Sequence, residues 1–253
     1  MESNENGDVT FPHAPANRLE GRRIVITGAA SGIARQTAKL FASEGASLTL
    51  LDRNEAQLLE AAQEIGAHAY AVDITDERSV AKAIVAGGAA MGGIDGVVNA
   101  AGIMLRGSVS EVSVVTWRTV LDINLTGMYI VIRECLPWLK RSSGATIVNI
   151  ASAQGLLPNS PNYTAYATSK AGVINLSRAL AAELAPEIRV NSICPGMVDT
   201  PMADGVRANT TNYALNRLAH PVEIAKTILF LSSPDSSYVT GVTLAADGGR
   251  TFH

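Results

Sequence analysis

The sequence predicts a doubly wound α/β fold, and three observations indicate it. Short runs of β-branched residues alternate with longer segments of helical periodicity from Arg22 to Gly249. The short runs are apolar at most positions, which is typical of strands buried on both faces. Strands that alternate with helices imply a parallel sheet with right-handed crossovers. We therefore expect a parallel sheet of about seven strands with helices on both faces.

The predicted elements follow one another in order along the chain. The expected strands are 22–27, 46–52, 67–73, 96–102, 145–152, 188–196 and 241–249. The expected helical segments are 32–45, 55–66, 77–90, about 113–141 and 166–184. The segment from Pro201 to Ala219 is expected to form a lid over the ends of the strands.

Length and composition favour one globular domain. The chain has 253 residues, of which 47% are hydrophobic and 17% are charged, and these values are ordinary for a packed core. Residues 1–18 are rich in Asn, Glu, Gly and Pro and lack apolar periodicity. We expect them to form a mobile N-terminal arm ahead of a single dinucleotide-binding catalytic domain over 19–253.

Charge and residue usage exclude several classes of function. The net charge is −3 and Lys and Arg are scattered, so neither nucleic acid nor an anionic membrane surface is an expected partner. The polar, acidic start of the chain is no secretory signal, which predicts a cytoplasmic protein. Cys135 and Cys194 lie far apart and are expected to be buried free thiols. The four histidines share no metal spacing, so no metal site is predicted.

A glycine-rich loop follows the first predicted strand. It reads Thr27-Gly28-Ala29-Ala30-Ser31-Gly32-Ile33-Ala34 and runs directly into a helix. Glycines at this point allow a tight turn and let backbone N–H groups approach a pyrophosphate at the positive end of the helix. The order of strand, loop and helix therefore favours a dinucleotide-binding Rossmann fold. Alanine stands where a third glycine is usual, and it can fill the same role in close helix packing.

Two acidic residues end the next two strands. Asp52 is placed to accept hydrogen bonds from the adenosine ribose and would repel the 2′-phosphate of NADP. Because the glycine loop also carries no cation, we predict NAD as the cofactor. Two alternatives stay open, namely that Asp52 merely begins the following helix and that Arg53 holds a phosphate. Asp73, which precedes Ile74, is placed either to meet the adenine or to cap the next helix.

Tyr166 and Lys170 lie four residues apart and so share one face of a predicted helix. A phenol of pKa about 10 must reach about 7 to exchange protons efficiently at neutral pH. An ammonium group about 4 Å away supplies on the order of 4 kcal/mol, which is enough for this shift, at an effective dielectric constant near 20. We therefore predict that Tyr166 is an acid/base in a site walled in from water.

Two polar residues elsewhere are candidates to join this pair. Ser152 follows a strand at its carboxyl end, where ligands bind in such sheets, and offers a hydroxyl to a carbonyl or alcohol oxygen. The alternative is a simple turn serine. Asn124 falls within a long predicted helix, where an amide often distorts the turn. A plain polar surface position is its alternative.

Taken together, these stretches resemble the short-chain dehydrogenase/reductase family over about residues 20–252. The resemblance rests on TGAASGIA, NAAG at 99–102, Asn124, Ser152, YATSK at 166–170 and PGMVDT at 195–200. It implies a catalytic tetrad in which Ser152 holds the substrate oxygen and Tyr166 transfers the proton. Lys170 would lower the pKa of the phenol and bind ribose, and Asn124 would keep a water that links Lys170 to solvent.

The resemblance also implies contacts with the cofactor and an assembly. Asn99, Ala100 and Gly102 would shape the strand edge beside the adenosine. A homotetramer is the assembly it implies. The residues expected to contact the nicotinamide and its amide are Pro195, Gly196, Val198 and Thr200.

The predicted function is NAD-dependent interconversion of a small secondary alcohol and its ketone. One alternative is a 3-oxoacyl carrier reductase that uses NADPH. Another is a nucleotide-sensing protein that has lost its chemistry, which the presence of all four tetrad residues disfavours. The predicted substrate contacts beside the tetrad are Gln154 and Met197. Further candidates for the pocket are Met104, Leu105, Leu156, Leu157, Tyr163 and Met202.

Overall fold

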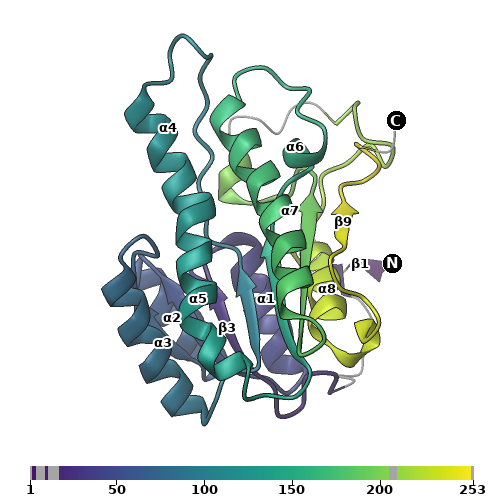
Figure 1. Cartoon of the computed structure of the whole chain (residues 1–253). Helices are drawn as coiled ribbons and strands as arrows, with labels where there is room; N and C mark the ends of the chain where they lie inside the picture. The colour runs from purple at the N-terminus through teal and green to yellow at the C-terminus, as the bar shows by residue number, and fades with distance from the viewer. Residues whose placement is uncertain (1, 4–8, 11–16, 205–209, 252–253) are drawn as a thin grey trace.

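A seven-stranded sheet forms the centre of the molecule (Figure 1). The computed structural model describes residues 2–3, 9–10, 17–204 and 210–251. All neighbouring strands of this sheet are parallel, in the order β5-β4-β3-β6-β7-β8-β9, so the predicted fold is confirmed. The strands are β3 (Arg23–Thr27), β4 (Ser47–Asp52), β5 (His68–Ala71), β6 (Gly96–Asn99), β7 (Ala145–Ile150), β8 (Ile188–Pro195) and β9 (Thr243–Ala246).

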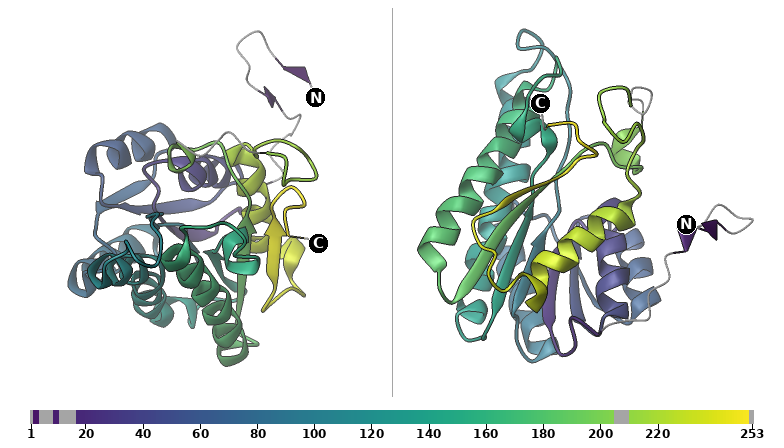
Figure 2. Two further views of the ribbon diagram at one scale, coloured as in Figure 1. Left: turned by 90° about the horizontal axis from the view of Figure 1, so that it is seen from above. Right: turned by 90° about the vertical axis from the view of Figure 1, so that its right-hand side faces the viewer.

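Helices cover both faces of the sheet (Figure 2). One face carries α1 (Gly32–Ser43), α2 (Glu55–Ile65) and α8 (Pro221–Ser232). The other carries α3 (Glu77–Met91), α5 (Gly127–Leu139) and α7 (Thr164–Leu184), while α4 (Val114–Leu121) packs against α7. Short helical turns are α6 (Ala153–Leu156), η2 (Pro201–Ala203) and η3 (Pro234–Ser236).

Helix α8 is absent from the predicted elements. It begins with Pro221, whose fixed φ suits the first turn, and the Glu223 carboxylate accepts from the backbone N–H of His220 at 2.8 Å. Its buried side chains, which include Ile228 and Leu229, pack on the same face as α1. Both the start signal and the apolar stripe are present in the sequence, so this element was predictable.

The helix ends follow the expected capping chemistry. Asn54 accepts from the backbone N–H of Gln57 at the start of α2, and Asp76 accepts from two backbone N–H groups at the start of α3. Both helices end at glycines with positive φ, Gly66 and Gly92, a conformation that costs glycine little. These signals end each helix at the point where the chain turns back toward the sheet.

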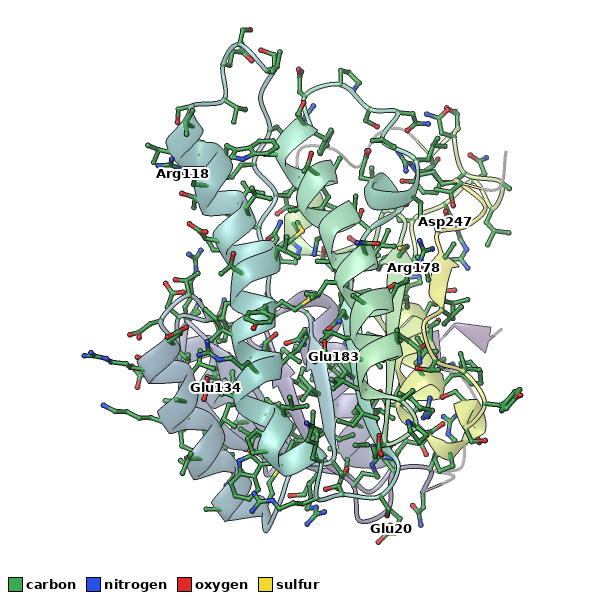
Figure 3. All side chains as sticks on the ribbon, in the orientation of Figure 1. Glu20, Arg118, Glu134, Arg178, Glu183 and Asp247 are labelled. Atoms are coloured by element: carbon green, nitrogen blue, oxygen red, sulfur yellow. The ribbon has the colours of Figure 1, made fainter. Side chains whose placement is uncertain are left out.

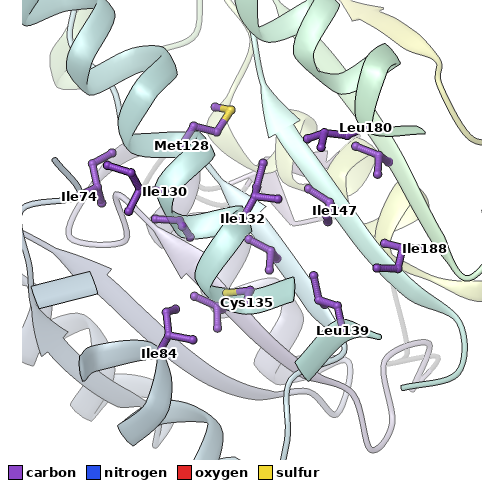
Figure 4. Close-up of a cluster of buried hydrophobic side chains, with 14 of the residues drawn as sticks. Ile74, Ile84, Met128, Ile130, Ile132, Cys135, Leu139, Ile147, Leu180 and Ile188 are labelled. Carbon is purple, nitrogen blue, oxygen red and sulfur yellow. The ribbon is translucent and has the colours of Figure 1, made fainter. Parts of the chain in front are cut away.

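Apolar side chains on the two faces of the sheet form two separate clusters. Figure 4 shows part of one, in which Met128 and Cys135 of α5 lie near Ile147 of β7 and Leu180 of α7. Cys135 and Cys194 are both fully buried and free, as predicted. Burial raises the pKa of the Cys135 thiol far above its ordinary value, so this side chain acts as a small apolar residue.

The helical segment predicted over about 113–141 contains a local change of geometry. Residues Asp122–Thr126 form a π-helical turn between α4 and α5. Such a turn inserts an extra residue into the helix and often marks a functional site. Asn124 lies at its centre and is completely buried. The predicted distortion is confirmed, and the alternative of a surface position is wrong.

The N-terminal segment is partly described. Strand β1 (Glu2–Ser3) pairs with β2 (Val9–Thr10) in an antiparallel arrangement. The Arg18 guanidinium donates to Glu44 at 2.8 Å, and its backbone N–H donates to the same carboxylate. The last residue of the predicted arm therefore contacts the residue that caps the end of α1, while residues 1, 4–8 and 11–16 lie outside the described residues.

Within the described residues, no helix is both long and apolar enough to span a bilayer. The predicted homotetramer and the mobility of the arm stay predictions.

Candidate active site

The carboxyl ends of the strands meet at the upper edge of the sheet in Figure 1. Thr27 pairs in register with Asn99, and Asn99 with Asn149. The chain leaves β3 toward β4 on one side and returns through β6 on the other. This reversal of strand order is the place where open α/β sheets bind ligands.

A cleft of about 340 Å³ lies at this reversal. Most of the predicted cofactor residues line it. They are Gly28, Ser31, Gly32, Ile33, Asp52, Arg53, Asp73, Ile74, Ala100, Gly102 and Thr200.

The glycine loop passes very close to the end of β6. Gly28 has φ of +72°, and a Cβ on it would lie 2.8 Å from both Cα and N of Ala101. The positive φ and the close backbone approach both exclude a side chain here, so only glycine fits without a shift of the backbone. The loop then enters α1, whose first turn has no acidic residue and whose N-cap Ser31 makes no side-chain cap. The N–H groups of that turn therefore remain available to an anion.

Asp52 ties the end of β4 to the glycine loop. One carboxylate oxygen accepts from the backbone N–H of Ala30 at 3.1 Å, and the other accepts from the backbone N–H of Asn54 at 2.9 Å. Because Asn54 is the N-cap of α2, the alternative that Asp52 begins this helix is wrong. Arg53 lines the same cleft, so the alternative that it holds a phosphate stays open.

Asp73 is likewise no helix cap. Its carboxylate accepts from the backbone N–H and the hydroxyl of Thr75, at 2.9 and 2.8 Å, while Asp76 caps α3. Asp73 and Ile74 are thereby held at the wall of the cleft.

Asn99 differs from the other predicted cofactor residues because it lines neither the cleft nor the cavity beside it. Its amide nitrogen donates to Asn149 at 2.9 Å, and the Asn149 amide donates to Ser177 at 3.0 Å. All three side chains are buried. This chain of hydrogen bonds joins β6, β7 and α7 beneath the loop 100–102.

A second cavity of about 160 Å³ opens beside the cleft. It shares six lining residues with the cleft, namely Ile33, Ala100, Gly102, Ile150, Thr200 and Met202. The predicted catalytic, cofactor and substrate residues that line this cavity but not the cleft are Ser152, Gln154, Tyr166, Lys170, Pro195, Gly196, Met197 and Val198.

Helix α7 presents Tyr166 and Lys170 to this cavity. Both are buried, with 8% and 4% of their surfaces exposed. The Lys170 ammonium donates to the carbonyl of Ile150 at 2.8 Å and lies 5.8 Å from the centre of the Tyr166 ring. A Cβ on Gly155 would lie 2.8 Å from the carbonyl carbon of Lys170. This close approach seats α6 directly on α7, and Ser152 is the N-cap of α6.

Asn124 connects two segments of the site by hydrogen bonds. Its amide oxygen accepts from the backbone N–H of Ile103 at 2.8 Å. Its amide nitrogen donates to the Ile103 carbonyl at 2.9 Å and to the Ser169 hydroxyl at 3.0 Å. The π-helical turn thus joins the loop after β6 to the helix that carries Tyr166 and Lys170.

Burial shifts the pKa values of both Tyr166 and Lys170. Burial raises the pKa of Tyr166, and hydrogen bonding with Ser152 lowers it by less. Burial also lowers the pKa of Lys170 to about 8. The pair considered alone predicts a lowered phenol pKa, so the direction found is a correction. Burial would strengthen the attraction between the Tyr166 phenolate and the Lys170 ammonium. It also removes water from both ions, which favours the neutral phenol and the neutral amine.

Several residues of the cavity match or depart from the sequence predictions. Met104, Tyr163 and Met202 line it as predicted, whereas Leu105, Leu156 and Leu157 do not. Tyr213 and Arg250 line it and were not predicted. Arg250 follows the last strand directly, in Asp-Gly-Gly-Arg, and so lies at the edge that holds every other site residue. That position was the available signal. Of the predicted lid, residues 205–209 lie outside the described residues.

Comparison with known proteins agrees with this geometry. A family model described as enoyl-(acyl carrier protein) reductase matches residues 28–251. The 3-oxoacyl-[acyl-carrier-protein] reductase FabG of Thermotoga maritima is 37% identical over 243 residues, which is 92% of this chain and 98% of the relative. The chain belongs to the short-chain dehydrogenase/reductase family. It is therefore an oxidoreductase of a family that binds a nicotinamide cofactor.

Two solved structures of proteins from Brucella melitensis are similar to this chain. One is described as a short-chain dehydrogenase/reductase, glucose/ribitol dehydrogenase, with 33% identity and a TM-score of 0.89 over 93% of this chain and 99% of that one. The other is a 3-ketoacyl-(acyl-carrier-protein) reductase complexed with NADH, with 34% identity and a TM-score of 0.89 over 92% and 100%.

Proposed function

We propose that this protein interconverts a small secondary alcohol and its ketone with NAD(H). The observation that carries the proposal is the placement of Tyr166 and Lys170, both buried, on the wall of a cavity that shares six residues with the cofactor cleft. A proton carrier at this junction is what hydride transfer to or from a carbon–oxygen bond requires.

The cleft fits a nicotinamide dinucleotide. The free N–H groups at the start of α1 suit the pyrophosphate, and Asp52 suits the hydroxyls of the adenosine ribose. When bound, the cofactor supplies the hydride acceptor or donor. The residues that would hold its nicotinamide end are Pro195, Gly196, Val198 and Thr200.

Each member of the tetrad has a distinct proposed task. Ser152 donates a hydrogen bond to the substrate oxygen, and Tyr166 takes or gives the proton on that oxygen. Lys170, held by the Ile150 carbonyl, binds ribose and supplies positive charge near the phenol. Asn124 is a positioning residue that holds the loop after β6 against α7.

Cofactor choice is the first test. We expect kcat/KM with NAD to exceed that with NADP by at least tenfold, because Asp52 would repel a 2′-phosphate. Asp52→Ala removes this repulsion and should lower the ratio of kcat/KM with NAD to kcat/KM with NADP by tenfold or more. The measurement is steady-state kinetics of both proteins with each cofactor.

Glu55→Ala is the matched control, since it removes an exposed carboxylate from the first turn of α2. It should leave the ratio unchanged. A tenfold preference of the unmodified protein for NADP would overturn the reading of Asp52. Arg53 would then be the phosphate ligand, and the alternative of an NADPH-dependent 3-oxoacyl carrier reductase would be favoured.

The pH dependence should differ between the two directions. Oxidation needs the phenolate of Tyr166, whose pKa is raised by burial, so kcat/KM for an alcohol should rise with pH from 7 to 10. Reduction needs the neutral phenol and should fall only as the pH approaches the same pKa. An oxidation profile that is flat over this range would contradict the assignment of Tyr166 as the base.

A further inference from the structure

We infer that the substrate is a hydroxy acid, or its keto acid, whose carboxylate binds Arg250. This inference rests on the proposed function and names the class of alcohol that the cavity accepts. Arg250 lines the same cavity as Ser152 and Tyr166 and has no part in the tetrad.

The main chain around Arg250 is firmly held. Asp247 follows β9 at the upper edge of the sheet (Figure 3), and its carboxylate accepts four hydrogen bonds from the turn that it begins. One oxygen accepts from the backbone N–H groups of Gly249 and Arg250, at 2.9 and 3.2 Å. The other accepts from the backbone N–H and hydroxyl of Thr251, at 3.0 and 2.6 Å. Asp247 is therefore committed to the backbone rather than to the guanidinium.

The guanidinium itself is only partly satisfied. Arg250 is 6% exposed, and its Nη2 donates to the Asn159 side chain at 2.5 Å and to the Ser160 hydroxyl at 3.5 Å. Its Nη1 is buried and has no hydrogen-bond partner. Both contacts that it makes are to neutral oxygens, and among the described residues no carboxylate forms an ion pair with it. A buried, unpaired cation is unfavourable, so the cavity that Arg250 lines is suited to a ligand that acts as its partner.

The charges around the cavity indicate what that partner is. Of the described residues that line it, Lys170 and Arg250 are charged, and both are cations. A substrate hydroxyl would satisfy Nη1 as an acceptor but would leave the charge unpaired. A carboxylate does both, and its two oxygens match the planar fork of a guanidinium. The cavity of about 160 Å³ equals roughly five water volumes, which suits a compact acid.

The test compares acids with neutral molecules of the same shape. The probes are 3-hydroxybutyrate and 4-hydroxypentanoate, each beside its primary amide, as substrates with NAD. We expect kcat/KM for the better acid to exceed that for its amide by at least tenfold. Arg250→Met keeps the apolar stem and should raise KM for the acid at least tenfold. It should change kcat by no more than a few fold, and it should lower kcat/KM for the amide much less than kcat/KM for the acid, so that the ratio of the two falls toward one.

Two further variants separate charge from structure. Arg250→Lys keeps the charge and loses the fork, so it should retain part of the preference for the acid. Arg178→Met removes an exposed cation from α7 and should retain all of it. Loss of the preference in Arg178→Met would mean that net charge rather than Arg250 attracts the acid, and would overturn the inference.

A binding measurement keeps this inference separate from the proposed function. In calorimetry with NAD present, cyclohexanecarboxylate should bind at least tenfold more tightly than cyclohexanecarboxamide, and Arg250→Met should abolish the difference. Equal binding of acid and amide overturns the inference, whatever the turnover. Turnover of neutral alcohols with no preference for acids overturns it too and leaves the proposed function intact. Absence of NAD-linked turnover of every acid and every amide contradicts the proposed function instead.

Discussion

Replacing Tyr166 by phenylalanine is expected to lower kcat at least a hundredfold while NAD binding stays intact. The variant keeps the aromatic ring, which is buried and packs edge-on against Tyr163 with 6.3 Å between ring centres. It loses only the hydroxyl that exchanges the proton. A positioned acid/base contributes about a hundred- to ten-thousandfold to rate, so the loss should fall within that range. The measurements are kcat for an alcohol substrate and the Kd of NAD.

The matched control is Tyr129→Phe, which removes a phenol hydroxyl from an exposed ring on α5. Its kcat should equal that of the unmodified protein. If Tyr166→Phe keeps more than about a tenth of the original kcat, the phenol is not the proton carrier and the mechanism must be abandoned.

Lys170→Met is expected to abolish most turnover and to weaken NAD binding, and it should also change how stability depends on pH. The pKa of Lys170 is lowered from 10.5 to about 8 by burial. Between these values the unfolded chain binds a proton that the folded chain does not, so the free energy of unfolding rises with pH. Relative to the variant, the unmodified protein should gain on the order of 2 kcal/mol in free energy of unfolding between pH 7 and pH 10.

Urea unfolding of both proteins at pH 7, 8, 9 and 10 measures this difference. The variant also loses the hydrogen bond to Ile150. That loss lowers the free energy of unfolding at every pH by a similar amount and changes its dependence on pH much less. Exposed Lys140 provides the control, because Lys140→Met should follow the unmodified protein at every pH. Parallel curves for the unmodified protein and Lys170→Met would show that Lys170 carries no desolvation penalty.

The sequence was sufficient for the sheet and most helices because their signals are local. Buried strands show as short apolar runs, and capping residues such as Asn54 and Asp76 mark the helix starts. Asn124 was singled out because an amide within a helix is unusual, and it lies in a π-helical turn. Helix α8 carries comparable signals in its first turn, so the sequence contains the information that predicts it.

Local sequence signals predict the positions of the site residues but not all of their properties. The motifs placed Ser152, Tyr166 and Lys170 around one cavity, because each follows from strand-end position or helix spacing. The direction of the phenol pKa did not follow, since it depends on how completely the surrounding helices exclude water. Arg250 was missed for a related reason. The signal is an unpaired Nη1, and only the positions of its neighbours show that, among the described residues, this nitrogen has no hydrogen-bond partner.

The six residues shared by the cleft and the cavity have a thermodynamic consequence. Thr200 and Met202 face both spaces, so any shift of this wall that suits one ligand alters the surface that the other meets. Under the proposed function the cofactor and the substrate would meet this wall from its two sides, and any change that one makes in the affinity of the other must be reciprocal. In steady-state kinetics, strong coupling of this kind would be observed as ordered binding, with the dinucleotide bound before the substrate.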